Sequence, residues 1–162
     1  MAVSMAAIYP FILFLHGLTR WLVLVGGIWL VYASVVSLGR SGPVGASPVQ
    51  APWRVFMGGI HLQFLLGLLL LFISPLALAA WSDMGAAMRV RPMRFFTMEH
   101  TTMMIVALVV AEIGRARVRK AVDARGAART SLIFGGISLL LILAAIPWPF
   151  MREIARPLLR SW

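Results

Sequence analysis

Long runs of apolar residues alternate with short polar segments along this chain. Four such runs stand out, at about residues 6–38, 55–80, 95–113 and 132–150. Each reaches the ~20 residues that a helix needs to cross the hydrocarbon core of a bilayer. Because backbone polar groups in lipid must bond to one another, runs this long are expected to be helices. With only short connections between them, the pattern predicts an all-α integral membrane protein, one domain forming an antiparallel four-helix bundle.

Two details of the runs concern prolines. The first run is longer than one crossing requires, so a tilted helix and an interfacial start with a kink at Pro10 are both compatible with it. The last run ends in Ile146-Pro147-Trp148-Pro149-Phe150. Two prolines there are expected to stop the helix, and Trp148 suits the membrane interface.

Composition agrees with the membrane assignment. Of 162 residues, 61% are hydrophobic and only 12% are charged, whereas soluble domains carry about 25% charged residues. A soluble fold of this size has too little interior to hide so much apolar surface, and disorder is excluded for the same reason. The chain has no cysteine, which excludes disulfides, thiolate metal sites and covalent haem attachment.

The chain is strongly basic, with a net charge of +10. Its arginines flank apolar runs, where they anchor helices at lipid headgroups, and no basic face interleaved with aromatic residues indicates nucleic acid. The side that lacks the termini carries eight basic residues: Arg40, Arg54, Arg115, Arg117, Arg119, Lys120, Arg125 and Arg129. The side of the termini carries six: Arg89, Arg91, Arg94, Arg152, Arg156 and Arg160. The positive-inside rule then favours the side without the termini as cytoplasmic, with both termini on the opposite side of the membrane.

The candidate chemistry begins with the three histidines, His16, His61 and His100, which lie in three different apolar runs. Ionisable groups inside a membrane are costly and are therefore functional candidates, and histidine is an axial ligand of haem b. In an antiparallel bundle His16 and His100 are expected at one level, near the side of the termini. His61 is expected nearer the opposite face. The pattern predicts one haem b between His16 and His100, because two bis-histidine haems need four histidines.

Two further charged residues lie close to these histidines in the sequence. Arg20 follows His16 by four residues and so shares its helix face, where a guanidinium suits a haem propionate. Glu99 precedes His100 and is expected either to neutralise Arg20 or to take part in proton exchange.

Each of these residues has a simpler interpretation. A histidine inside a span can be an interhelical hydrogen-bonding residue, Arg20 can mark the interface, and Glu112 is expected to pair with Arg115 or Arg119. Met103 and Met104 lie about one turn after His100, so a copper(I) site is a further alternative. If one haem is bound, His61 remains for a second site, a hydrogen bond to quinone or a structural role.

Four segments together resemble a family of small four-span bacterial membrane proteins that is labelled cytochrome-b-like and is common in Bacteroidetes and their relatives. They are Leu15-His16-Gly17-Leu18-Thr19-Arg20-Trp21, His61-Leu62-Gln63-Phe64-Leu65-Leu66-Gly67 followed by Ser74-Pro75, Arg94-Phe95-Phe96-Thr97-Met98-Glu99-His100, and Ile146-Pro147-Trp148-Pro149-Phe150. The resemblance covers nearly the whole chain. It implies a haem-associated four-helix protein with His16, His61 and His100 at the family's histidine positions.

The sequence therefore predicts a membrane protein that binds haem b and carries single electrons, with quinone or within a respiratory or photosynthetic complex. Two alternatives from other classes remain open. One is a non-catalytic accessory subunit whose His, Arg and Glu form an internal polar network and which packs against other membrane subunits. The other is a copper-handling or oxidase-assembly protein that uses all three histidines.

Overall fold

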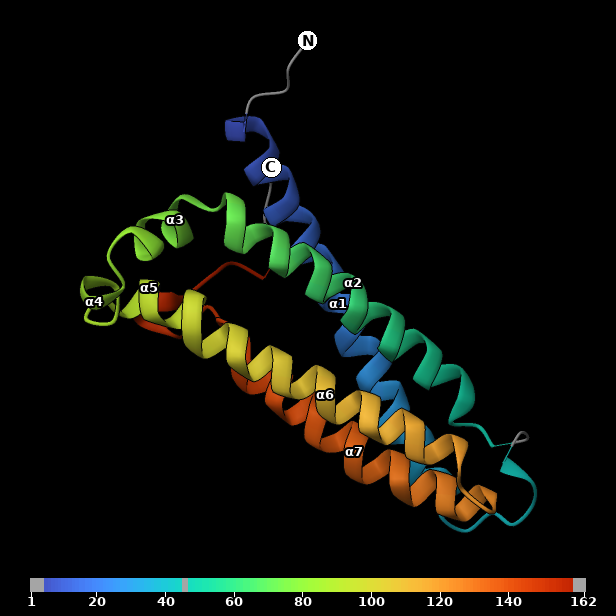
Figure 1. The fold of residues 1–162 in the computed structure, drawn as a ribbon. Helices are drawn as coiled ribbons and strands as arrows, with labels where there is room; N and C mark the ends of the chain where they lie inside the picture. Colours follow the sequence, from blue (N-terminus) through green and yellow to red (C-terminus); the bar gives the residue numbers. More distant parts are fainter. Residues whose placement is uncertain (1–4, 45–46, 159–162) are drawn as a thin grey trace.

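The computed structural model describes residues 5–44 and 47–158, and this part of the chain is mostly helical, with no strand. Figure 1 shows the order of its elements. They are α1 (Met5–Ser37), α2 (Gln50–Ile73), α3 (Pro75–Ser82), α4 (Met84–Ala87), α5 (Arg91–Arg94), the π-helix η2 (Phe95–Glu99), α6 (His100–Arg119), α7 (Ala124–Ala145) and the 3₁₀-helix η3 (Arg152–Ile154).

Four helical stretches are long and apolar enough to cross a membrane, and they run antiparallel. They are Ile8–Ser37 within α1, α2, the continuous stretch Arg91–Arg119 that contains α5, η2 and α6, and α7. In Figure 1, α1 lies against α2 while α6 lies against α7, and the two pairs are joined most closely at the end where α7 begins. The predicted all-α four-helix bundle is confirmed.

Large side chains fill the centre of the bundle. Trp53, Phe56, Leu30 and Ile60 are buried almost completely, and the indole of Trp53 donates a 2.7 Å hydrogen bond to the hydroxyl of Ser131. The outer surface is also apolar, since many leucines, valines and aromatic residues on the long helices are half exposed or more. A protein with an apolar exterior as well as an apolar core is suited to lipid on its outer side.

Prolines decide where two of the helices end. The predicted second span runs to residue 80, but α2 ends at Ile73, and the helix resumes in another direction as α3. The residue before a proline is driven into an extended conformation, and Ser74 before Pro75 has φ −71° and ψ 128°. The predicted fourth span runs to residue 150, but α7 ends at Ala145, where Ile146 before Pro147 has φ −69° and ψ 128°.

The third connection is shorter than the segment between the predicted third and fourth spans, residues 114–131. Helix α6 continues to Arg119 and α7 begins at Ala124, so most of the basic residues lie on helical turns beyond the apolar cores. Asp123 caps α7 by accepting a 2.7 Å hydrogen bond from the amide of Gly126. Alanine and arginine are strong helix formers, and arginine side chains reach the headgroups from such turns.

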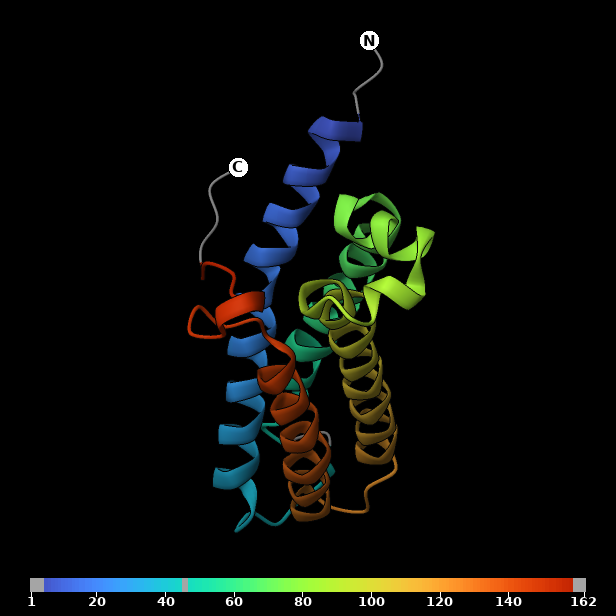
Figure 2. The same cartoon turned by 90° about the vertical axis from the view of Figure 1, so that its left-hand side faces the viewer.

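The chain after α7 turns back across the end of the bundle. Figure 2 shows this C-terminal segment, in red, beside the blue ribbon of α1. The carbonyl of Leu158 accepts hydrogen bonds from Arg20 at 2.5 Å and from the indole of Trp21 at 3.3 Å. The segment therefore closes the end of the bundle at which α1 and α2 diverge from α6 and α7.

Candidate functional site

A cavity of about 300 Å³ lies at this end of the bundle. Its walls come from α1, α2, α3, the η2–α6 junction and the C-terminal segment, and most of the lining is apolar. Such volumes and apolar walls with a few polar groups are typical of cofactor and ligand sites. The polar groups here include both His16 and His100, together with Arg20, Gln63 and Arg156.

His16 and His100 are brought together across the cavity. Their ring centroids are 6.3 Å apart and the ring planes are inclined at 68°. The Nδ1 of His100 lies 2.8 Å from the carbonyl oxygen of Ala145, and a carbonyl can only accept, so Nδ1 carries the proton. The Nε2 of a neutral His100 therefore keeps its lone pair. The Nδ1 of His16 is buried and has no hydrogen-bond partner among the described residues.

A π-helical turn precedes His100. In η2, Phe95–Glu99, one extra residue is accommodated within a turn, and the hydroxyl of Thr101 donates to the carbonyl of Phe96 five residues earlier. One residue corresponds to about 100° of rotation around a helix. The π-turn therefore sets which face of α6 carries His100.

A buried amide holds the backbone of α1 at His16. The side chain of Gln63 on α2 donates a 2.9 Å hydrogen bond to the carbonyl of His16 and accepts one from the hydroxyl of Thr19. Gly67, one turn further along α2, faces the imidazole, because a Cβ there would lie 3.3 Å from Cε1 of His16. Helix α2 thus fixes the position of a histidine that belongs to α1.

Arg20 lines the same cavity as His16, as their spacing predicts. It is 9% exposed, its Nε has no partner among the described residues, and its one recorded hydrogen bond goes to the carbonyl of Leu158. Arg20 lies near the middle of the helical stretch Ile8–Ser37, at the end of the bundle that the C-terminal segment closes. A second arginine, Arg156, reaches the cavity from the C-terminal segment, with its guanidinium 4.6 Å from the ring centroid of Phe96.

The prediction that Glu99 neutralises Arg20 is wrong. The carboxylate of Glu99 accepts a 2.7 Å hydrogen bond from Nε of Arg94, on the turn that precedes it. The π-turn places His100 on the side of α6 that faces the cavity between the histidines. Glu99, the residue before it, is not among the residues that line this cavity. Within residues 5–44 and 47–158, no carboxylate pairs with Arg20 or Arg156.

His61 lies apart from the other two histidines. Its Nε2 is 2.8 Å from a carboxylate oxygen of Glu112 on α6, so the expected pairing of Glu112 with Arg115 or Arg119 is wrong. Among the residues that the structure describes, no cluster of three or more His, Asp or Glu side chains could hold a metal ion. A copper site built from all three histidines is therefore contradicted.

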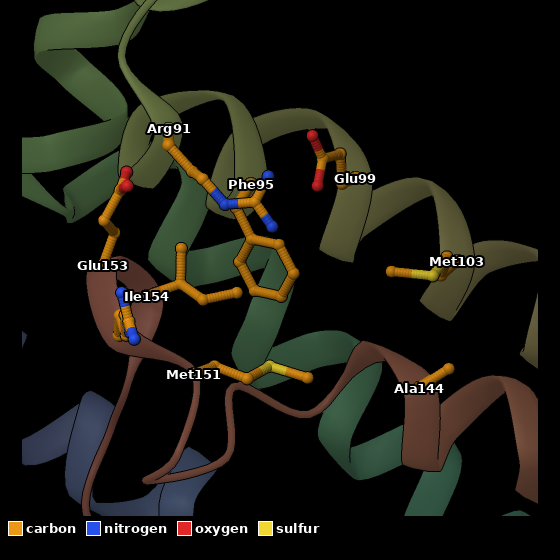
Figure 3. Close-up of a pocket in the computed structure, with 9 residues that line it drawn as sticks. Arg91, Phe95, Glu99, Met103, Ala144, Met151, Glu153 and Ile154 are labelled. Atoms are coloured by element: carbon orange, nitrogen blue, oxygen red, sulfur yellow. The ribbon is translucent and has the colours of Figure 1, made fainter.

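A second cavity, of about 460 Å³, has Phe95 in its lining (Figure 3). Charged residues of both signs line it, and it is also bounded by methionines and Phe95. The charged residues are Arg91, Glu99, Arg152 and Glu153. The ring of Phe95 also lies 6.0 Å from that of His100, centroid to centroid, so Phe95 both lines this cavity and neighbours the histidine pair.

Gln63 and Arg156 complete the site and were not singled out as candidates in the sequence. Gln63 is the polar member of an apolar run, which is a usable signal of an interhelical contact. Arg156 lies in a segment that resembles a basic helix flank, and only the return of the chain across the bundle brings it to the cavity.

No family model matches this chain, and no curated protein or solved structure matches it either. The resemblance to cytochrome-b-like proteins stays a prediction.

Proposed function

We propose that this protein binds one haem b in the cavity between His16 and His100 and carries single electrons. The observation that carries the proposal is the spacing of the two imidazoles. An imidazole nitrogen lies about 2 Å from a metal that it binds, so two rings on opposite sides of one ion have centroids roughly 6 Å apart. The centroids of His16 and His100 are 6.3 Å apart.

The hydrogen bonds of the two histidines support the same assignment. A metal-binding histidine usually donates its other ring N–H to a carbonyl, which fixes the tautomer and the ring orientation. His100 does so toward Ala145, which leaves Nε2 as the ligand atom. The Nδ1 of His16 is buried and has no partner among the described residues, and a metal bond is one way to compensate the burial of an imidazole nitrogen.

Arg20 and Arg156 are suited to bind the two carboxylates of a haem. Haem b has a flat apolar body and two carboxylates, and the cavity has apolar walls with two guanidinium groups among its lining residues. Arg20 and Arg156 pair with no carboxylate in the described part of the chain. Guanidinium groups bind carboxylates through paired, charge-assisted hydrogen bonds.

A haem b held by His16 and His100 would supply one-electron redox chemistry. The chain's own contribution is to hold and orient the ligand nitrogens through Gln63, Ala145 and the π-turn. Apolar side chains limit access of water, and Arg20 and Arg156 favour an anionic edge of the cofactor.

The second cavity suggests where a quinone partner binds. A quinone head group is flat and has two acceptor oxygens, and Phe95 with the guanidinium of Arg91 or Arg152 offers a ring face and donors. Replacement of Arg91 by Gln is expected to slow haem reduction by a short-chain quinol while reduction by dithionite is unchanged. Arg89→Gln is the matched control, since Arg89 is exposed and does not line the cavity.

We further place the protein in the bacterial inner membrane, as a multi-pass protein with both termini in the periplasm. The excess of basic residues on the opposite side of the bundle, eight against six, supports this orientation. The histidine pair then lies toward the periplasmic side.

The direct test is a reduced-minus-oxidised absorbance spectrum of the purified protein after haem supplementation. We expect Soret and α bands of a low-spin haem in the unsubstituted protein and in His61→Leu, and their loss in His16→Leu and in His100→Leu. His61→Leu is matched because it removes a histidine outside the cavity. If no variant, including the unsubstituted chain, shows these bands, haem binding is refuted and an accessory subunit with an internal polar network becomes the better description.

A further inference from the structure

A polar pair interrupts the apolar outer surface within the membrane-spanning part of the bundle. His61 on α2 and Glu112 on α6 lie 2.8 Å apart, and their side chains are 50% and 48% exposed. Both belong to helical stretches that are long and apolar enough to span a bilayer. Ionisable side chains in spans normally face the interior of a bundle or an aqueous cavity.

The hydrogen bonds of this pair are incomplete within one chain. The Nδ1 of His61 donates to the carbonyl of Met57 at 2.8 Å, so Nε2 is the atom that meets the carboxylate. The carboxyl group of Glu112 has room for several hydrogen bonds, and among the described residues it makes one, with Nε2 of His61. Lipid tails supply none, which makes this surface a poor one to present to the hydrocarbon.

The surface next to the pair allows close approach by another helix. Gly58, one turn before His61, is exposed, and a Cβ built on it meets no atom within 4 Å. Leu65, one turn after His61, is 61% exposed, and Ile113 beside Glu112 is 42% exposed. Small residues at such positions let helix backbones pack closely in membranes.

We propose that this α2–α6 surface, around His61 and Glu112, is the contact between two copies of this chain. Copies inserted in the same orientation are related by a two-fold axis along the membrane normal, so the same residues meet at the same depth. The pair is self-complementary under that rotation, because His61 of one copy faces the partner's Glu112 and the reverse contact is equivalent. The half-exposed polar groups then lie inside a larger bundle. This proposal does not depend on haem.

The absence of cysteine from the sequence makes a clean crosslinking experiment possible. Leu65→Cys places a thiol on the proposed contact, and Leu140→Cys places one on α7 at a similar depth with similar exposure, 61% and 66% for the two leucines. The full chain is reconstituted in phosphatidylcholine–phosphatidylglycerol vesicles and treated with a short bis-maleimide. We expect Leu65→Cys to give mainly a crosslinked dimer and Leu140→Cys to remain mainly monomeric.

Two further variants in the Leu65→Cys background test the residues that form the contact. The double change His61→Leu with Glu112→Leu is expected to raise the dimer dissociation constant roughly 3- to 20-fold, the range for interhelical polar contacts in membranes. Gly58→Leu is expected to weaken the dimer while both polar groups remain. Circular dichroism checks that helix content is retained. The proposal is overturned if Leu65→Cys crosslinks no more than Leu140→Cys, or if neither variant weakens the dimer in a folded protein.

Discussion

Replacing Gly17 by leucine tests whether the cavity between His16 and His100 binds a cofactor or has only a structural role. Gly17 follows His16 and lines the cavity, and a Cβ built on it meets no atom within 4 Å. A leucine at this position therefore extends into the cavity without displacing its neighbours. Because leucine is a better helix former than glycine, the helix itself gains about 0.5–1 kcal/mol.

The volume of the cavity sets the expected size of the effect. Four heavy atoms at roughly 30 Å³ each, the share of a water molecule, take about 120 Å³. That is more than a third of the 300 Å³ cavity. If the four added atoms exclude about four atoms of a bound haem at ~0.3 kcal/mol each, the loss is about 1.2 kcal/mol, or roughly 8-fold in dissociation constant.

The assay is a titration of the purified apoprotein with haem, followed by Soret absorbance. Gly136→Leu is the matched control, because a Cβ at Gly136 on α7 also meets nothing within 4 Å and Gly136 does not line the cavity. We expect Gly136→Leu to bind haem like the unsubstituted protein and both variants to keep their helix content. Equal haem affinity for Gly17→Leu and Gly136→Leu would refute the assignment of this cavity.

Three further predictions concern the surroundings of the site. Arg20→Leu and Arg156→Leu should each lower the midpoint potential of the haem by tens of millivolts in a redox titration, because loss of a nearby cation favours the oxidised iron. Unchanged potentials in both variants would place the arginines away from the cofactor. Gln63→Leu should cost about 1 kcal/mol of stability in a detergent unfolding titration, since α1 and α2 lose hydrogen bonds at the backbone of His16. An unchanged free energy of unfolding would contradict this role of Gln63. Gly114→Ala should cost about 1–3 kcal/mol in the same titration, because its Cβ would come within 2.3 Å of Cβ of Phe134 and the helices must move apart; an unchanged midpoint would contradict that packing.

Much of the fold follows from local features of the sequence. Apolar runs of sufficient length predicted four helices, because helices satisfy their own backbone in lipid. The boundaries were less accurate. The apolar run continues past Ser74, although Pro75 interrupts the helix there, and the helices α6 and α7 continue into basic residues because hydropathy marks the hydrocarbon core rather than the helix end.

Part of the candidate site was also predictable from the sequence. The level of His16 and His100 could be inferred by counting residues along antiparallel helices, and the i, i+4 spacing placed Arg20 on the face of His16. These inferences need only the geometry of a helix and the antiparallel order of neighbouring helices, which short connections impose.

The partners of the charged residues were decided by tertiary structure alone. The π-turn at Phe95–Glu99 shifts the register of α6, so Glu99 bonds Arg94 instead of Arg20. The rotation of α6 against α2 brings Glu112 to His61, and the return of the chain after Pro147 brings Arg156 to the cavity. A sequence determines the length and depth of its helices through local energetics, whereas rotation about each helix axis depends on packing against every neighbour at once.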